Sequence, residues 1–101
     1  MWAPLKDPVW VEFYEEFQRE PYRPHDDWRP MIRAVRYLQS QEYADGLHAC
    51  SSLMHLSVTT APSYEELAGH DAIWITWRPV LHRFCMYYDC GITVPHKARR
   101  N

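Results

Sequence analysis

The stretch from Ala72 to Tyr88, AIWITWRPVLHRFCMYY, limits the possible folds of this chain more than any other part of the sequence. Its two halves are rich in β-branched and aromatic residues, which favour strands. Between them stands Pro79, a residue that suits the second position of a type I turn. The stretch therefore predicts two antiparallel strands joined by a tight turn at residues 78–81.

A turn at this place decides which side chains lie opposite one another. On one face the predicted pairs are Ile75 with Phe84, Ile73 with Met86 and Trp77 with His82. On the other face they are Trp74 with Cys85, Thr76 with Arg83 and Ala72 with Tyr87. The first face is apolar, as a half-buried antiparallel sheet requires. Odd-numbered residues of the first strand should therefore face the core, and Trp74 should lie on the outside.

An amphipathic helix is predicted near the N-terminus. Asp7-Pro8 is typical of a helix start, because the carboxylate can cap the first turn and proline fits its first position. The apolar face that follows has helical spacing and consists of Trp10, Phe13, Tyr14 and Phe17. Pro21 and Pro24 should end the helix.

A second helix should begin near Asp26 or Asp27, hold Pro30 in its first turn and end at Asp45-Gly46. Its apolar face repeats the helical spacing and consists of Met31, Ala34, Val35 and Leu38.

The opposite side of this helix carries a stripe of three arginines, Arg29, Arg33 and Arg36. We expect a solvated face that lies beside the glutamates of the first helix, because exposed ion pairs are common and weak. The alternative is a site for an anion or a nucleic-acid backbone, helped by the basic tail Lys97–Arg100. A net charge of −2 disfavours nucleic-acid binding as the main function.

Leu47–Thr60 is predicted to form one longer strand, because Met54, Leu56 and Val58 alternate with polar residues. The apolar positions upstream have the opposite parity. This reversal indicates either a bulge near Ser51-Ser52 or a central strand that is covered on both faces, which is the interpretation we prefer.

The predicted architecture is an α+β domain in which two helices cover one face of a three-stranded antiparallel sheet. The order is helix, helix, strand, short helix, strand, strand, with Ser63–Glu66 matching the capping box of the short helix, which should end near Gly69. A chain of 101 residues holds one core, so residues 1–101 form one domain. Residues 1–6 and 95–101 should fray.

Composition excludes several classes of protein. The chain is 47% apolar and 24% charged, which is typical of a globular domain, and it has no apolar run near the roughly 18 residues that a membrane span needs. Its first residues lack the pattern of a signal peptide. Three cysteines, an odd number, argue against a disulfide framework. We therefore expect a cytoplasmic protein.

The aromatic content is the strongest hint of function. Five tryptophans and seven tyrosines exceed what one small core holds, and such residues are enriched at protein interfaces. The sheet face away from the helices should display Trp74, Tyr87, Arg83, Thr76 and His55. We therefore expect a small non-enzymatic protein, without a cofactor, that pairs with itself as a homodimer or holds another protein. By elimination, a bacterial accessory or inhibitor protein fits this size.

Two chemical functions are the alternatives. His48 and Cys50 point to one face of a strand and, with Cys85 and Cys90, could bind a metal ion, but no CxxC or HExxH spacing supports such a site.

The second chemical alternative is a Cys85 thiol activated by His55, with Asp89 or Ser57 as the group that orients the imidazole. No glycine-rich oxyanion loop accompanies these residues, because Gly46, Gly69 and Gly91 all lie at predicted element boundaries.

Overall fold

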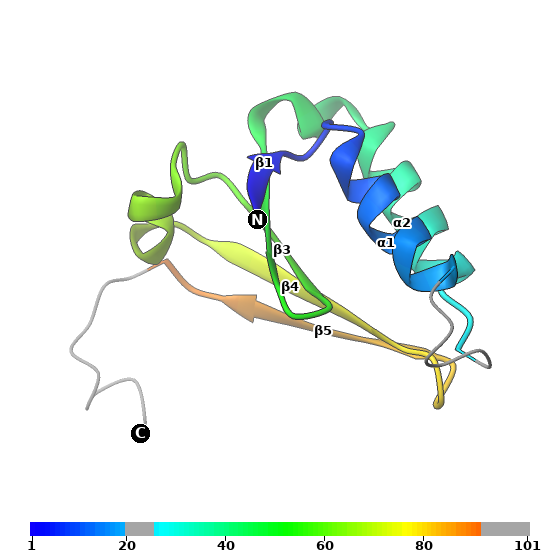
Figure 1. Cartoon of the computed structure of the whole chain (residues 1–101). Helices are drawn as coiled ribbons and strands as arrows, with labels where there is room; N and C mark the ends of the chain where they lie inside the picture. Colours follow the sequence, from blue (N-terminus) through cyan, green and yellow to red (C-terminus); the bar gives the residue numbers. More distant parts are fainter. Residues whose placement is uncertain (20–25, 92–101) are drawn as a thin grey trace, which may run out of the picture.

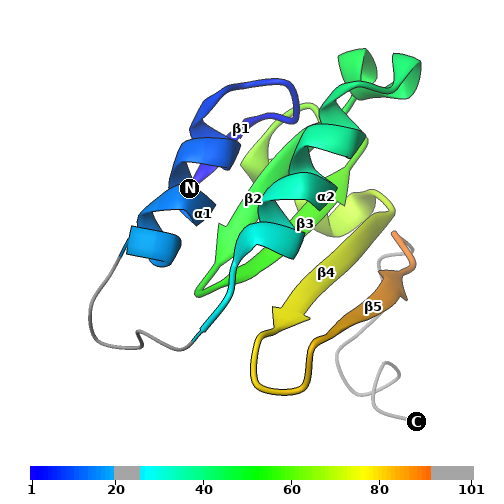
Figure 2. The same ribbon diagram turned by 90° about the vertical axis from the view of Figure 1, so that its right-hand side faces the viewer.

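The computed structural model describes residues 1–19 and 26–91, and it confirms the α+β class. Two α-helices lie side by side over one face of a single antiparallel sheet (Figures 1 and 2). The sheet has five strands rather than the predicted three, in the order β1-β2-β3-β4-β5. The elements are β1 (Trp2–Pro4), α1 (Val9–Arg19), α2 (Arg29–Gln39), β2 (His48–Ser52), β3 (His55–Thr59), β4 (Ala72–Arg78) and β5 (Arg83–Asp89), with the 3₁₀ helices η1 (Glu42–Gly46) and η2 (Tyr64–Gly69).

Helix α1 begins where the sequence predicts. The Asp7 side chain caps it, since its Oδ1 accepts a hydrogen bond of 2.9 Å from the backbone N–H of Val9. Trp10 and Tyr14 are fully buried on the face toward the sheet, and Phe13 packs at their side.

Helix α2 is shorter than predicted. It begins at Arg29, with Pro30 in its first turn, and ends at Gln39 instead of at residues 45–46. At its end the Ser40 hydroxyl donates a hydrogen bond of 2.7 Å to the carbonyl of Tyr37, a local bond that competes with further helix. The segment expected to be its last turns forms η1 instead.

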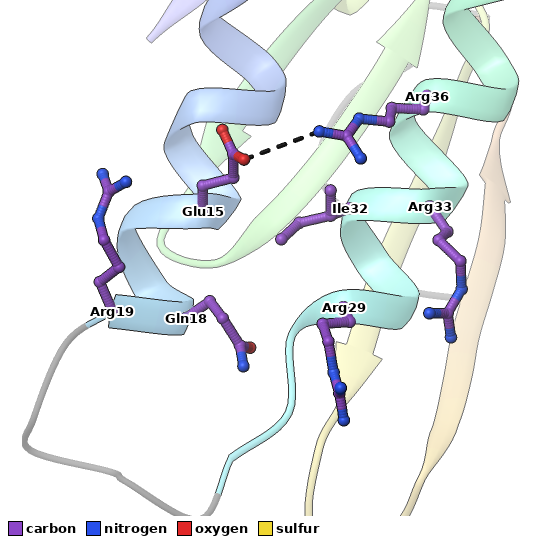
Figure 3. A pocket seen from close by; sticks show the side chains of 7 residues that line it. All are labelled: Glu15, Gln18, Arg19, Arg29, Ile32, Arg33 and Arg36. Carbon is purple, nitrogen blue, oxygen red and sulfur yellow. Dashed lines mark ion pairs between the residues drawn. The ribbon is translucent and has the colours of Figure 1, made fainter.

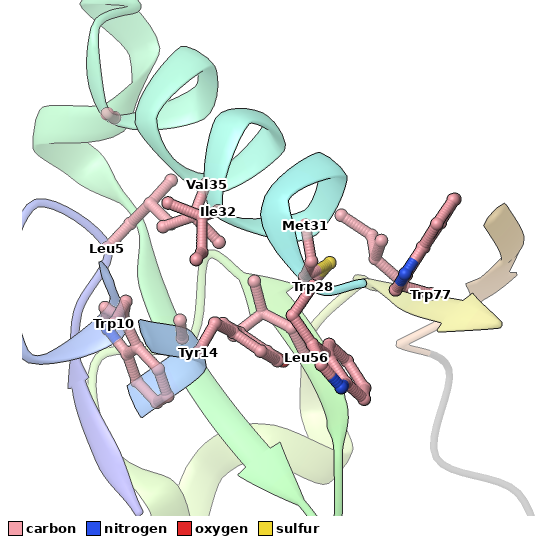
Figure 4. Packing of buried hydrophobic residues seen from close by; sticks show 12 residues of the cluster. Leu5, Trp10, Tyr14, Trp28, Met31, Ile32, Val35, Leu56 and Trp77 are labelled. Atoms are coloured by element: carbon pink, nitrogen blue, oxygen red, sulfur yellow. The ribbon is translucent and has the colours of Figure 1, made fainter. Parts of the chain in front are cut away.

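The core lies between the two helices and strands β2 to β4 (Figure 4). Three of its buried rings place their polar atoms on backbone carbonyls, as buried Trp and Tyr usually do. The indole N–H of Trp10 donates to Pro4 at 2.9 Å, that of Trp77 to Asp27 at 2.6 Å, and the Tyr14 hydroxyl to Met54 at 3.1 Å. Burial raises the pKa of the Tyr14 hydroxyl well above its ordinary range.

The predicted long strand Leu47–Thr60 is a hairpin. Strands β2 and β3 pair with Ser52 opposite His55, so that only Leu53 and Met54 form the loop. The reversal of apolar parity marks this turn rather than a bulge or a central strand. Ala49 on β2 and Leu56 on β3 both reach the core, although one number is odd and the other even.

The N-terminal residues, expected to fray, belong to the sheet. In β1, Trp2 lies opposite Cys50 of β2, and Leu5 directly after the strand is fully buried. Burial of Leu5 and of the Trp10 ring above it explains why this end is ordered. The other predicted frayed segment, 95–101, lies outside the described residues.

Within the described ranges, neither α1 nor α2, at 11 residues each, is long and apolar enough to cross a membrane.

Candidate functional site

The β4–β5 hairpin forms the strands that the sequence predicts, in a register that differs by two residues. The observed pairs include Ile75 with Met86, Trp77 with Phe84 and Trp74 with Tyr87. The predicted pairs, in which Ile75 met Phe84 and Trp74 met Cys85, are therefore wrong.

The cause of the shift is the loop, which holds four residues, 79–82, instead of two. The N–H of Leu81 donates to Arg78 at 3.1 Å, which places Pro79 at the second position of a turn as predicted. His82 then adopts a left-handed backbone, with φ of 50°, and adds length before β5 begins. A shift of two residues keeps every side chain on its face. Trp74 accordingly lies on the side away from the helices, as predicted.

The helical layer is narrower than the sheet. Figure 2 shows α2 in front of β2 and β3 and α1 beside it toward β1, with β4 and β5 extending to the other side. Ile75 and Trp77 of β4 belong to the core, but Ile73 on the same face is 47% exposed. On β5 the helix-side residues Phe84, Met86 and Tyr88 are all exposed, with Met86 at 66%. An apolar strip, Ile73, Phe84, Met86 and Tyr88, is therefore left uncovered.

The far face of the sheet, meaning the side away from the helices, carries the interaction residues predicted from the sequence. Trp74 is half-buried and stacks on the exposed ring of Tyr87, with centroids 6.2 Å apart and planes at 11°. Thr76 is buried and hydrogen-bonded to Nδ1 of His55. Arg83 is exposed and lies directly opposite Arg78. The five predicted residues lie on adjacent strands of this one face. Thr76 is buried, however, so little of its side chain is accessible to a partner.

The remainder of the far face is covered by the chain itself. Trp2 stacks on His48 with centroids 5.2 Å apart, and Tyr64 of η2 meets Trp2 edge-on. Beneath these rings Cys50 and Ser57 are buried. Among the described residues, the Oγ of Ser57 and the Nδ1 of His48 have no hydrogen-bond partner. The accessible aromatic area of this face therefore falls into two parts, Tyr64 over the β1–β2 side and Tyr87 with Trp74 on β4 and β5.

Strand β5 is also an unpaired edge. It is the last strand of the sheet, and within the part of the chain that the structure describes no segment pairs with its outer side. Six of its seven residues are exposed, and the seventh, Asp89, is half-buried. The strand lacks the proline and lysine residues with which proteins usually block an exposed edge. A long aromatic edge of this kind is a template for another strand.

The C-terminal end of β5 is fixed to the start of β4. The Tyr88 hydroxyl donates a hydrogen bond to the Asp71 carboxylate, and the N–H of Gly91 donates to the same group at 2.8 Å. These two bonds lower the pKa of Asp71, and the carboxylate in turn raises the pKa of Tyr88 to about 12. The edge is therefore held in place at both its hairpin end and its free end.

The arginine stripe lines a groove of about 390 Å³ on the outer side of the two helices (Figure 3). Carboxylates already engage most of its cations. Asp27 binds Arg29 at 2.9 and 3.0 Å, which lowers the pKa of Asp27 to about 2, and Glu15 of α1 lies 3.7 Å from Arg36. The pair between Arg36 and Glu15 is the predicted contact between stripe and glutamates. Arg33 alone of the stripe has no ion pair among the described residues.

The candidate metal and thiol residues are not assembled into a site. Thr76 on β4 lies opposite Cys85 of β5 and is hydrogen-bonded to His55 of β3. It therefore stands between the proposed base, His55, and the proposed thiol, Cys85. Cys85 and Cys90 are exposed, whereas Cys50 is buried on β2. Within residues 1–19 and 26–91, no group of three or more His, Cys, Asp or Glu could hold a metal ion.

The sequence-based reasoning missed the helix-side residues Phe84, Met86 and Tyr88 as surface. It gave the sheet three strands, which two helices can cover, so every apolar residue on the helix side was expected to be buried. The sequence feature that could have revealed this exposure is the parity reversal near residue 52, because it adds a strand to the sheet.

In comparisons with known proteins, no family model matches the chain, and no curated protein or solved structure matches it either.

Proposed function

We propose that this chain is a non-enzymatic protein-interaction module that docks its partner along β5. The observation that supports this most is the combination on one strand of an edge that no described segment pairs with and exposed aromatic side chains on both faces. Addition of a strand to such an edge is a common mode of protein recognition, in which main-chain hydrogen bonds supply affinity and side chains supply specificity.

The side chains of β5 are of the types that contribute most to protein interfaces. Phe84, Tyr87 and Tyr88 are aromatic, and Met86 is adaptable and apolar. Tyr87 is backed by the half-buried Trp74, so its ring is held in one orientation before any partner binds. A ring that is already ordered loses less conformational entropy on docking.

The cellular setting belongs to the same proposal. Cys85 and Cys90 are free and exposed, and thiols of this kind persist in a reducing compartment. We place the module in the cytoplasm, as a bacterial accessory or inhibitor protein, which accords with its single small domain.

The experiment measures protection of the β5 amides by hydrogen exchange and mass spectrometry. The isolated protein is studied over a range of concentrations, and then in a lysate of its native cells. Association should slow the exchange of residues 83–89, because their outward N–H groups become hydrogen-bonded. Met86→Lys places a charge on the exposed apolar strip and should abolish the added protection.

The matched control is Tyr37→Lys, since Tyr37 on α2 is 63% exposed and lies outside the sheet. This variant should retain the protection. Rapid exchange of residues 83–89 under every condition, in a protein with a folded circular-dichroism spectrum, would rule out β5 as a docking strand.

A further inference from the structure

We infer that the partner of β5 is a second copy of this chain, paired antiparallel through a two-fold axis at Met86. This inference rests on the proposed function and names the occupant of the edge. The result would be one continuous ten-stranded sheet, five strands from each copy. Two-fold pairs are the commonest form of assembly among homo-oligomers.

The order of residues in β5 is complementary to itself about this axis. Met86 would face Met86 of the second copy, and Phe84 would face Tyr88 on the helix side. On the far face, Cys85 would lie opposite Tyr87 and Arg83 opposite Asp89. Each apolar residue then meets an apolar or aromatic one, and each charge meets its opposite. Cross-strand pairs of both kinds stabilise antiparallel sheets.

Neighbouring registers lose this match. If the axis passed through Cys85, Arg83 would face Tyr87 of the second copy, and Asp89 would lie beyond the paired strand. If it passed through Tyr87, Asp89 would face Cys85 of the second copy and Arg83 would lie outside. Only an axis through Met86 pairs all seven residues of Arg83–Asp89.

A like-charge pair inside the single chain favours the same arrangement. Arg78 and Arg83 are directly opposite on β4 and β5, which is an unfavourable placement for two cations. In the proposed dimer, Asp89 of the second copy lies on the other side of Arg83. The carboxylate would then offset the repulsion between the two arginines.

The helices leave room for the second copy. They stop short of β5, as Figure 2 shows, so the second sheet can continue the first without meeting a helix at the axis. The uncovered apolar strips of the two copies, each formed by Ile73, Phe84, Met86 and Tyr88, would become one surface between two helical layers. Lateral packing of Phe84 on Tyr88 and of Met86 on Met86 across the edge adds apolar side-chain contact to the main-chain bonds.

The first test is a charge exchange, with dissociation measured by analytical ultracentrifugation. The parent should sediment with twice the mass of the chain at high concentration. Arg83→Asp should weaken the dimer by about tenfold, because two Asp–Asp contacts replace two ion pairs. Asp89→Arg should do the same, and the double variant Arg83→Asp/Asp89→Arg should restore the parent's dimer.

The same variants separate the dimer from folding. In the single chain, Arg83→Asp faces Arg78 and removes a repulsion, so its melting temperature at low concentration should not fall. A double variant that dimerises no better than either single one would overturn the assigned register.

The second test fixes the register by cross-linking in a background of Cys50→Ala, Cys85→Ser and Cys90→Ser. Met86→Cys should form a disulfide dimer on mild oxidation, since directly opposite Cα atoms lie about 4.5–5.5 Å apart. Tyr88→Cys is the control, because its two copies would be roughly 14 Å apart along the strands. Cross-linking of Tyr88→Cys at the rate of Met86→Cys would overturn the arrangement.

Failure here is distinguishable from failure of the proposed function. A parent that stays monomeric at all concentrations, and whose β5 is protected only in the lysate, overturns self-pairing and retains the docking strand. A monomer whose β5 is protected under neither condition overturns both.

Discussion

At the scale of single residues, two loop positions stand out because they hold a positive φ without glycine or asparagine. Leu53 has φ of 55° in the β2–β3 loop, and His82 has φ of 50° in the β4–β5 loop. The left-handed region costs an ordinary residue about 1–2 kcal/mol. Both loops therefore retain strain that the paired strands on either side impose.

Leu53→Gly should raise the free energy of unfolding by about 0.5–1 kcal/mol, which is the relief of strain less the greater freedom of glycine in the unfolded chain. Little packing is lost, because the Leu53 side chain is largely exposed. Leu53→Ala is the control, since alanine keeps the β-carbon and the strain. Urea unfolding of the three proteins makes the comparison, and equal stability of the glycine and alanine variants would contradict the strained loop.

At the scale of secondary structure, β5 depends on its two ends because no helix among residues 1–19 and 26–91 covers it. The hairpin loop fixes one end, and Asp71 fixes the other through Tyr88 and Gly91. A β-carbon at position 91 would lie 2.3 Å from the carbonyl carbon of His70, so the chain passes too closely there for any residue but glycine.

Removal of the carboxylate should release this end of β5. In Asp71→Asn the pKa of Tyr88 should fall from about 12 toward its ordinary value of 10.0. Absorbance of tyrosinate as a function of pH measures the shift. The buried Tyr14 serves as an internal reference, since burial rather than Asp71 raises its pKa.

The same contact gives stability a dependence on pH at both extremes. The pKa of Asp71 is lowered by folding, so its contribution is complete above the unfolded value of 3.8 and is lost as the pH falls through the lower folded value. The pKa of Tyr88 is raised, so its contribution is complete below 10.0 and is lost as the pH rises through about 12. Asp71→Asn should remove both dependences, and an unchanged Tyr88 titration would contradict the contact.

At the scale of the whole molecule, two layers of unequal width decide what is core and what is surface. The helices lie over the β1–β3 side of a five-stranded sheet, so Leu56 of β3 is buried while the apolar residues of β5 are exposed (Figure 2). Folding stability and association should therefore depend on different apolar residues of the same sheet face.

Leu56→Ala and Met86→Ala test this division. Leu56 is fully buried, so its truncation should lower the free energy of unfolding by about 2–5 kcal/mol. Met86→Ala should change it by no more than about 0.5 kcal/mol at concentrations where the chain is monomeric. Urea unfolding in dilute solution measures both. A loss of stability in Met86→Ala comparable to that in Leu56→Ala would show that β5 is covered in the monomer.

Local patterns in the sequence determined that two amphipathic helices form, the two strands β4 and β5, and the face on which Trp74 lies, but not where α2 ends. Helical spacing around Trp10 and the Asp7 cap are interactions within a few residues, so they can be inferred without the fold. Alternation in β4 likewise assigns Ile75 and Trp77 to the core in any register that shifts by an even number.

Tertiary structure alone decided the number of strands, the register of the hairpin and the exposure of β5. The two loops depend on Leu53 and His82 adopting positive φ, a conformation that neither sequence position announces as glycine would and that the pairing of the strands enforces. Burial of Met86 or Tyr88 depends on whether a helix reaches them, and that follows from the relative widths of two layers built by distant segments. The alternation of apolar and polar residues along a strand determines the face on which each side chain lies. Whether that side chain is buried depends on distant segments of the chain, and whether the edge of β5 is paired depends, as we infer, on a second copy.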